Sequence, residues 1–142
     1  MNDLFLKVAA ATPDIRVADP DYNTEQIIEC MQKANTEHAK LLVLPELCLT
    51  GYTCGDLFLQ KALLDGAISG LNRIRKVSAN MDMMTIVGLP FSYMNRLYNV
   101  AAVVFHGEVI CLIPNFMKQG ILQPPRKRAF SFICRNFAMR RD

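Results

Sequence analysis

Short apolar runs divide the first part of the chain and predict its strands. The runs Leu4–Ala11, Leu41–Leu44 and Met84–Leu89 are bounded by residues that favour turns, a pattern typical of buried strands. Two further runs, Leu97–Phe105 and Val109–Ile113, lie so close together that they favour a hairpin. The sequence therefore predicts five strands, of which the last two pair with each other.

Two longer stretches between these runs repeat apolar residues at helical spacing. The first begins at an N-cap, Asn23 or Thr24, and continues to about His38. The second is capped by Asp56 and covers Leu57–Asn80. Each helix joins two neighbouring strands, which is the arrangement that parallel strands require.

The remaining connections decide the fold class. We expect a loop at Pro90–Arg96 and an exposed turn at His106–Gly107. The order is then strand, helix, strand, helix and three strands. Because crossover units are combined with a hairpin, the sequence favours an α/β fold with a mixed sheet that carries its helices on one face.

Composition excludes several classes of protein. Of the 142 residues, 51% are hydrophobic and 20% charged, as in ordinary globular domains. No apolar stretch is long enough to span a membrane and the N-terminus lacks the pattern of a signal peptide, so we expect a cytoplasmic protein. The five cysteines form no CxxC pair and only two histidines accompany them, which predicts reduced thiols and no metal site.

Charge divides the chain near residue 117. Residues 1–117 carry 9 basic and 12 acidic side chains, whereas residues 118–142 carry 7 basic and one acidic side chain. Aromatic and basic residues are interleaved in this tail, a pattern that also occurs in proteins that bind single-stranded nucleic acid. A non-enzymatic binding module whose basic tail contacts nucleic acid is therefore one hypothesis for the chain.

One carboxylate stands where the second predicted strand ends. Leu41–Pro45 is unbroken apolar sequence, and Glu46 follows it directly. In α/β folds, ligands bind at the edge where parallel strands end. A single Glu after a strand is also a common solvated or capping residue, so the pattern alone leaves both interpretations open.

The sequence around this carboxylate is similar to a known family. The run Leu44–Phe58 (LPELCLTGYTCGDLF) resembles the glutaminase domain of glutamine-dependent NAD synthetases, which belongs to the nitrilase, or carbon–nitrogen hydrolase, superfamily. The resemblance begins at Val8–Pro13 and continues to about Pro114. It implies that residues 1–114 form the first half of a four-layer α-β-β-α sandwich. Residues 115–142 depart from the family pattern, and we expect them to be frameshifted or disordered.

The resemblance also implies a chemistry. The family hydrolyses amides with a glutamate that moves the proton, a lysine that stabilises the oxyanion and a cysteine that attacks the carbonyl carbon. Glu46 matches the glutamate, and we expect apolar strand ends to enclose it. Asn115 follows Pro114, where the family has its lysine, and none of the five cysteines matches the nucleophile. Tyr52 is the expected substrate-binding residue.

The resemblance finally sets expectations for partners and cofactors. Glutamine is the family's substrate, and its ammonia converts nicotinic acid adenine dinucleotide to NAD in a synthetase domain that uses ATP and Mg²⁺. The sequence shows no such domain, so we expect a fragment that has no cofactor of its own, is inactive alone and self-associates through uncovered apolar surface. Whether the chain is itself an enzyme stays open. The alternatives are another nitrilase-like amidase with an altered catalytic set and the binding module described above, although we do not favour nucleic-acid binding.

Overall fold

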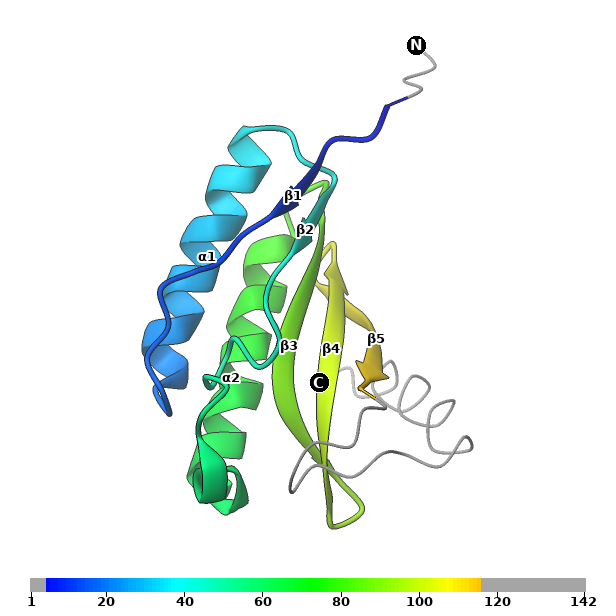
Figure 1. Cartoon of the computed structure of the whole chain (residues 1–142). Coiled ribbons are helices and arrows are strands. Elements are labelled where there is room, and N and C mark those ends of the chain that lie inside the picture. Colours follow the sequence, from blue (N-terminus) through cyan, green and yellow to red (C-terminus); the bar gives the residue numbers. More distant parts are fainter. Residues whose placement is uncertain (1–4, 116–142) are drawn as a thin grey trace.

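A computed structural model of the chain describes residues 5–115, which form one sheet and two main helices (Figure 1). The basic tail, and all of the departure from the family pattern except Asn115, lie outside the described residues. The elements, in chain order, are β1 Val8–Ala10, α1 Pro20–Thr36, β2 Leu41–Val43, the 3₁₀ helix η1 Gly55–Leu59, α2 Lys61–Ser78, β3 Met84–Tyr93, β4 Arg96–Phe105 and β5 Glu108–Pro114.

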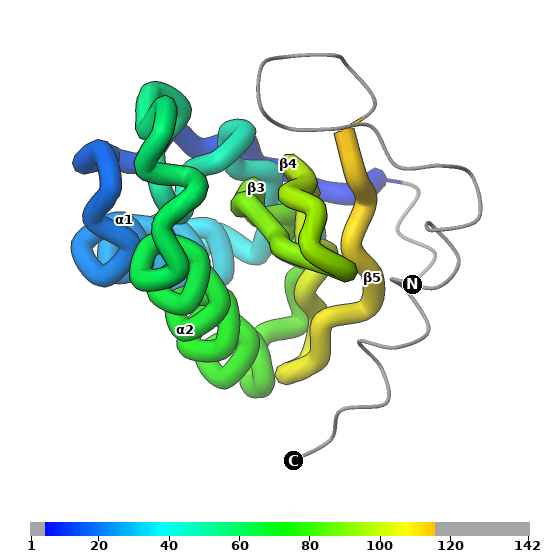
Figure 2. The backbone as a smooth tube through the Cα atoms, turned by 90° about the horizontal axis from the view of Figure 1, so that it is seen from below, coloured from blue at the N-terminus to red at the C-terminus, as the bar shows by residue number. Residues whose placement is uncertain are grey.

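The five strands form one mixed sheet in the order β1-β2-β3-β4-β5. β1, β2 and β3 are parallel, and β4 and β5 continue the sheet as antiparallel strands. Both helices lie on the same side of the strands (Figure 2). The predicted α/β fold, with a mixed sheet that carries its helices on one face, is thereby confirmed.

The start of α1 differs from its prediction. Asp19 is the N-cap, because its carboxylate accepts a hydrogen bond from the Tyr22 N–H at 3.1 Å, and Pro20 follows in the first turn. Asn23 and Thr24, the expected caps, lie inside the helix and are fully buried. The Thr24 hydroxyl donates to the Pro20 carbonyl within the helix, whereas the Asn23 side chain bonds to the backbone of Arg16 and Leu49, tertiary contacts that cannot be read from a local pattern.

The second predicted helix is divided in two. Asp56 lies inside η1, whose N-cap is Cys54, and α2 begins only at Lys61 after Gln60. Gln60 has an extended backbone, with φ −80° and ψ 123°, so the chain turns between the two helices. The prediction that Asp56 caps one continuous helix was therefore wrong, although α2 buries apolar residues at helical spacing, among them Leu63, Ala67 and Leu71.

The predicted loop at Pro90–Arg96 was also wrong, because β3 and β4 form a long hairpin there. Their register pairs Pro90 with Asn99 and Tyr93 with Arg96. The turn contains only Met94 and Asn95, whose φ angles are both positive, as a two-residue hairpin turn requires. Pro90 is tolerated because β2 pairs with β3 only as far as Ile86, so no β2 ladder bond is lost at the proline.

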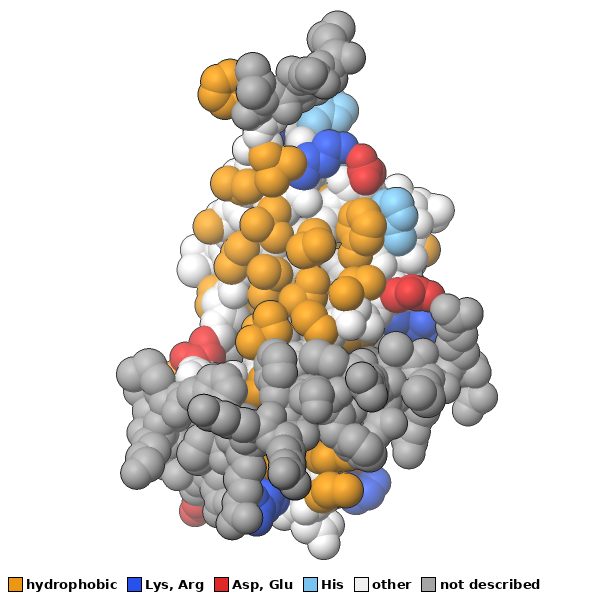
Figure 3. All heavy atoms as spheres, turned by 90° about the vertical axis from the view of Figure 1, so that its right-hand side faces the viewer, with side chains coloured by type: hydrophobic (Ala, Val, Ile, Leu, Met, Phe, Trp, Pro, Cys, Tyr) orange, Lys and Arg blue, Asp and Glu red, His pale blue; other side chains and the backbone are white. Residues whose placement is uncertain are grey.

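The two faces of the sheet differ in their surroundings. The face toward the helices carries the main core, which includes Leu42, Val87 and Val104. Apolar side chains gather on the opposite face (Figure 3). Val43 and Ile113 belong to it because each follows a core residue, Leu42 or Leu112, along its strand, and both are partly exposed. We call this opposite side the outer sheet face.

Candidate active site around Glu46

Glu46 lies in a loop that crosses β3 at very short range. The Leu44 N–H donates to the Ile86 carbonyl at 3.1 Å, and the Leu49 N–H donates to the Gly88 carbonyl at 3.2 Å. Between these two bonds, a Cβ atom on Gly88 would lie 2.4 Å from the Leu47 nitrogen. Only glycine allows this approach, so Gly88 determines how closely the Glu46 loop sits on the sheet.

The loop is tightly folded and anchored to α1. Leu47 has a φ of 52°, and its carbonyl accepts hydrogen bonds from the N–H groups of Thr50 at 3.1 Å and Gly51 at 2.8 Å. The side chain of Asn23 in α1 donates to the Leu49 carbonyl at 3.2 Å. Glu46 is therefore carried on a backbone that is held from the sheet on one side and from a helix on the other.

Two asparagine amides meet on the Glu46 carboxylate. The Asn99 side chain donates a hydrogen bond to Oε1, and the Asn115 side chain donates to the same oxygen at 2.8 Å. The Asn115 backbone N–H also donates to the Asn99 carbonyl at 2.8 Å. These donors come from β4 and from the residue after β5, so the strand register brings together groups that are far apart in the sequence.

The surroundings of the carboxylate correct one expectation. Glu46 was expected to be enclosed by apolar strand ends, but the residue is exposed in the described structure. The apolar residue Leu47 turns inward instead, into a small cluster with Phe58 and Leu63. The positive φ of Leu47 reverses the chain at this point, which buries Leu47 and leaves Glu46 outside.

Asn115 lies where the resemblance places a lysine. Sequence reasoning identified it only by its position after Pro114, and the structure brings its amide to Glu46. Asn99 was missed as a site residue. An asparagine within an apolar strand was a visible signal, but only the pairing of β3, β4 and β5 shows that it reaches Glu46.

The thiols near the Glu46 loop are not prepared for attack. Burial raises the pKa of Cys48 to about 12, and its Sγ donates to the Gly88 carbonyl at 3.6 Å. Burial also raises the pKa of Cys54, whose Sγ lies 3.1 Å from the Thr50 carbonyl. A nucleophilic cysteine needs a lowered pKa, so these two residues pack the walls of the loop.

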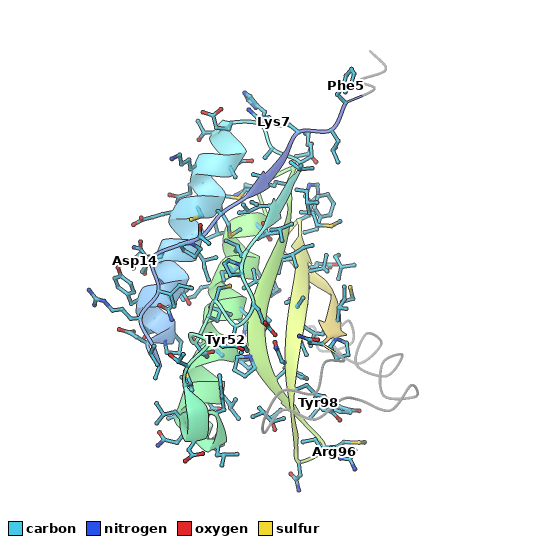
Figure 4. The ribbon with its side chains drawn as sticks, viewed as in Figure 1. Phe5, Lys7, Asp14, Tyr52, Arg96 and Tyr98 are labelled. Atoms are coloured by element: carbon cyan, nitrogen blue, oxygen red, sulfur yellow. The ribbon has the colours of Figure 1, made fainter. Side chains whose placement is uncertain are left out.

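Tyr52 lies in the same loop, six residues after Glu46. Tyr52 is 59% exposed, and Figure 4 shows it on the loop that follows β2. Its expected contact with substrate stays a prediction.

Within residues 5–115, no group of three or more His, Cys, Asp or Glu side chains could hold a metal ion. None of the described helices is long and apolar enough to cross a membrane.

Comparisons with known proteins relate this site to a family. A family model described as carbon–nitrogen hydrolase matches residues 7–130. The glutamine-dependent NAD(+) synthetase of Mycobacterium tuberculosis is 34% identical over 110 residues, which are 78% of this chain and 16% of that protein. The corresponding enzyme of Xylella fastidiosa is 36% identical over 106 residues, 74% of this chain and 19% of that protein.

Solved structures agree in fold. A glutamine-dependent NAD(+) synthetase from Cytophaga hutchinsonii matches with a TM-score of 0.79 and 25% identity, over 86% of this chain and 22% of that chain. A mutant of an amidase from Nesterenkonia AN1, of the nitrilase superfamily, matches with a TM-score of 0.74 and 21% identity, over 86% of this chain and 49% of that chain. The chain thus spans about a sixth to a fifth of the length of the curated relatives named here.

Proposed function

Because the chain belongs to the carbon–nitrogen hydrolase family and is homologous to the N-terminal part of glutamine-dependent NAD(+) synthetases, we propose that it is the carboxylate-bearing portion of a glutaminase domain. The observation that carries this proposal is the placement of Glu46. It follows the second parallel strand, and two amides, one from β4 and one from the residue after β5, donate hydrogen bonds to it.

In the proposed reaction, Glu46 moves protons during hydrolysis of the glutamine side-chain amide. It accepts the thiol proton while a cysteine sulfur attacks the amide carbon, and passes that proton to the nitrogen as the C–N bond breaks and ammonia leaves. It then takes a proton from the water that hydrolyses the thioester, which yields glutamate and restores the thiol. The exposure of Glu46 leaves its carboxylate accessible to such partners.

The proposal places the nucleophile outside this chain. Cys48 and Cys54 have raised pKa values and bond to backbone carbonyls, so neither supplies a thiolate at neutral pH. Asn115 donates one neutral hydrogen bond where a lysine would add a full positive charge for the oxyanion. The chain by itself should therefore not turn over glutamine.

Further roles follow from the same proposal. Tyr52, exposed in the Glu46 loop, contacts the substrate or the ammonia outlet. Residues 1–114 are the glutaminase portion, residues 115–142 depart from it, and a synthetase domain that binds ATP and Mg²⁺ would amidate nicotinic acid adenine dinucleotide to NAD. Cys30, Cys48 and Cys54 form no disulfide within residues 5–115, which fits a reducing compartment, and we place the chain in the cytoplasm.

The contact of Asn115 with Glu46 favours one alternative function within the same family. An amidase with an altered catalytic set would replace the lysine by a neutral donor, and Asn115 provides such a donor to Glu46 at 2.8 Å. Such an enzyme would hydrolyse small amides without a synthetase partner. A panel of amide substrates, with glutamine among them, separates the two functions.

The test of the proposed function is an ammonia-release assay on the purified chain with glutamine, beside a Glu46→Gln variant. We expect both proteins to release ammonia at the same background rate. Release by the unaltered chain well above the variant, with a trapped thioester on any of its cysteines, would contradict the proposal and show that the nucleophile lies within the chain.

A further inference from the structure

The hydrogen bonds on Glu46 are distributed unequally between its two oxygens. Both amide donors, Asn99 and Asn115, bond to Oε1. Within residues 5–115, Oε2 accepts no hydrogen bond, and Glu46 is exposed. The carboxylate is therefore held by one oxygen and open at the other.

The two donors are themselves joined. Asn99 lies in β4 opposite Pro90, where β3 and β4 are paired continuously, so its backbone position is fixed by a long ladder. Asn115 follows β5 directly, and its backbone N–H donates to the Asn99 carbonyl at 2.8 Å. Because the donors stand on paired strands and Glu46 stands on a loop, the strands orient the loop side chain.

We propose that Asn99 and Asn115 are positioning residues that hold Glu46 through Oε1 and reserve Oε2 as the atom that exchanges protons. The role of Oε2 rests on the proposed function, whereas the orienting contact itself does not. We call this pair of contacts the amide clamp. Since both donors are neutral amides, the clamp orients the carboxylate without neutralising its charge.

An orienting role of Asn99 and Asn115 and a merely structural role predict different behaviour of the Glu46 side chain. If the two asparagines only hold β4 and β5 together, a substitution at Glu46 leaves their side-chain amide resonances unchanged. Glu46 is then as mobile as any other exposed glutamate. If they form the amide clamp, their amide resonances report on Glu46, and the order of the Glu46 side chain depends on both of them.

Side-chain NMR on the full 142-residue chain separates these cases. We expect Glu46→Ala to shift the Nδ2 resonances of both Asn99 and Asn115, because it removes their common acceptor. The matched control is Glu37→Ala, a change at another exposed glutamate, which pairs with Lys7 elsewhere on the molecule and should leave both resonances in place.

The order of the Glu46 methylene groups gives the second measurement. In the double variant Asn99→Ala, Asn115→Leu, which removes both donors, we expect its squared order parameter to fall below about 0.6, the range of flexible groups. Restoring a donor with Lys at position 115 should return most of the lost order. An unchanged backbone amide spectrum shows that each variant is folded.

Two results would overturn the amide clamp. The first is that the amide resonances of Asn99 and Asn115 do not shift in Glu46→Ala, and the second is that the Glu46 methylene groups keep their order parameter in the variant that lacks both donors. Either result would leave the proposed function standing. Conversely, the ammonia-release assay can contradict the proposed function while the clamp resonances still respond as expected.

Discussion

At the scale of single residues, burial of Cys48 has a measurable chemical consequence. Because burial raises the pKa of this thiol to about 12, only one molecule in ~10⁴ carries the thiolate at pH 8, against about a quarter for an ordinary cysteine. We expect alkylation of Cys48 in the native chain to be at least about 10³-fold slower than in the chain unfolded by urea. Mass spectrometry of labelled peptides over time measures both rates.

The sign of the pH dependence follows from the same shift. Raising the pH toward 12 increases the thiolate fraction of Cys48, so its labelling should still accelerate at pH values where an ordinary thiol is already fully ionised. A labelling rate that levels off near pH 9 would show that Cys48 is not buried as described.

The second prediction for a single residue concerns Gly88. A Cβ atom there would lie 2.4 Å from the Leu47 nitrogen and 2.7 Å from the Pro45 carbonyl oxygen, and neither backbone atom can rotate away. We expect Gly88→Ala to lower the free energy of unfolding by about 1–3 kcal/mol or more and to displace the Glu46 loop. Urea unfolding measures the first effect and the Glu46 resonances the second.

Gly55→Ala is the matched control for this change. Gly55 has a φ of 52°, but a Cβ atom there would meet nothing within 4 Å. We expect Gly55→Ala to lower the free energy of unfolding by only about 1 kcal/mol and to leave the Glu46 loop in place. Equal effects of the two substitutions would contradict the role assigned to Gly88.

At the scale of elements, Asn23 connects α1 to two loops. Its buried side chain accepts from the Arg16 N–H at 2.7 Å and donates to the carbonyls of Arg16 at 2.8 Å and Leu49 at 3.2 Å. Asn23→Ala leaves these backbone groups unpaired, so we expect a loss of about 2–4 kcal/mol in the free energy of unfolding. Asn72→Ala, at an exposed position of α2, should cost less than about 0.5 kcal/mol. Similar costs at the two sites would refute the connecting role.

The helices and strands also show what sequence could predict. The positions of β2, β4 and β5 followed from apolar runs, because a buried strand must be apolar wherever it lies in the fold. The start of α1 and the β3–β4 hairpin did not follow. Asn23 is polar yet buried because neighbouring segments provide its hydrogen-bond partners. Pro90 lies within a strand because the pairing of β2 with β3 ends before it.

The sequence also predicted only part of the candidate site. Glu46 was identified from its place after a strand and from the family resemblance, both of which are local signals. Its exposure and its bond to Asn99 depend on the positive φ of Leu47 and on the register of β4, neither of which is local. Sequence therefore identified the carboxylate and the position of Asn115, but not Asn99 and not the contact of either amide with Glu46.

At the scale of the whole molecule, the outer sheet face predicts association. Val43 and Ile113 are 40% and 42% exposed on this face, where apolar side chains gather (Figure 3). We expect the chain to associate at increasing concentration, and lysine at both positions to shift it toward the monomer. Sedimentation velocity over a concentration series measures the change.

Val17→Lys is the control for this prediction. Val17 is 53% exposed but lies in the loop before α1, away from the outer sheet face. It should leave the association unchanged. A chain that is monomeric throughout the series, or a Val17→Lys variant that dissociates equally, would contradict the prediction.

The central claim is that this chain supplies the proton-moving carboxylate of a glutaminase. The most direct measurement transfers residues 7–114 into the matching region of the Mycobacterium tuberculosis synthetase, with the rest of that protein kept. We predict that the folded chimera releases ammonia from glutamine, that Glu46→Gln lowers its kcat by about 10²–10⁴, and that His106→Gln, in the exposed β4–β5 turn, leaves kcat unchanged. A folded chimera that keeps its kcat with Gln at position 46 would contradict the account.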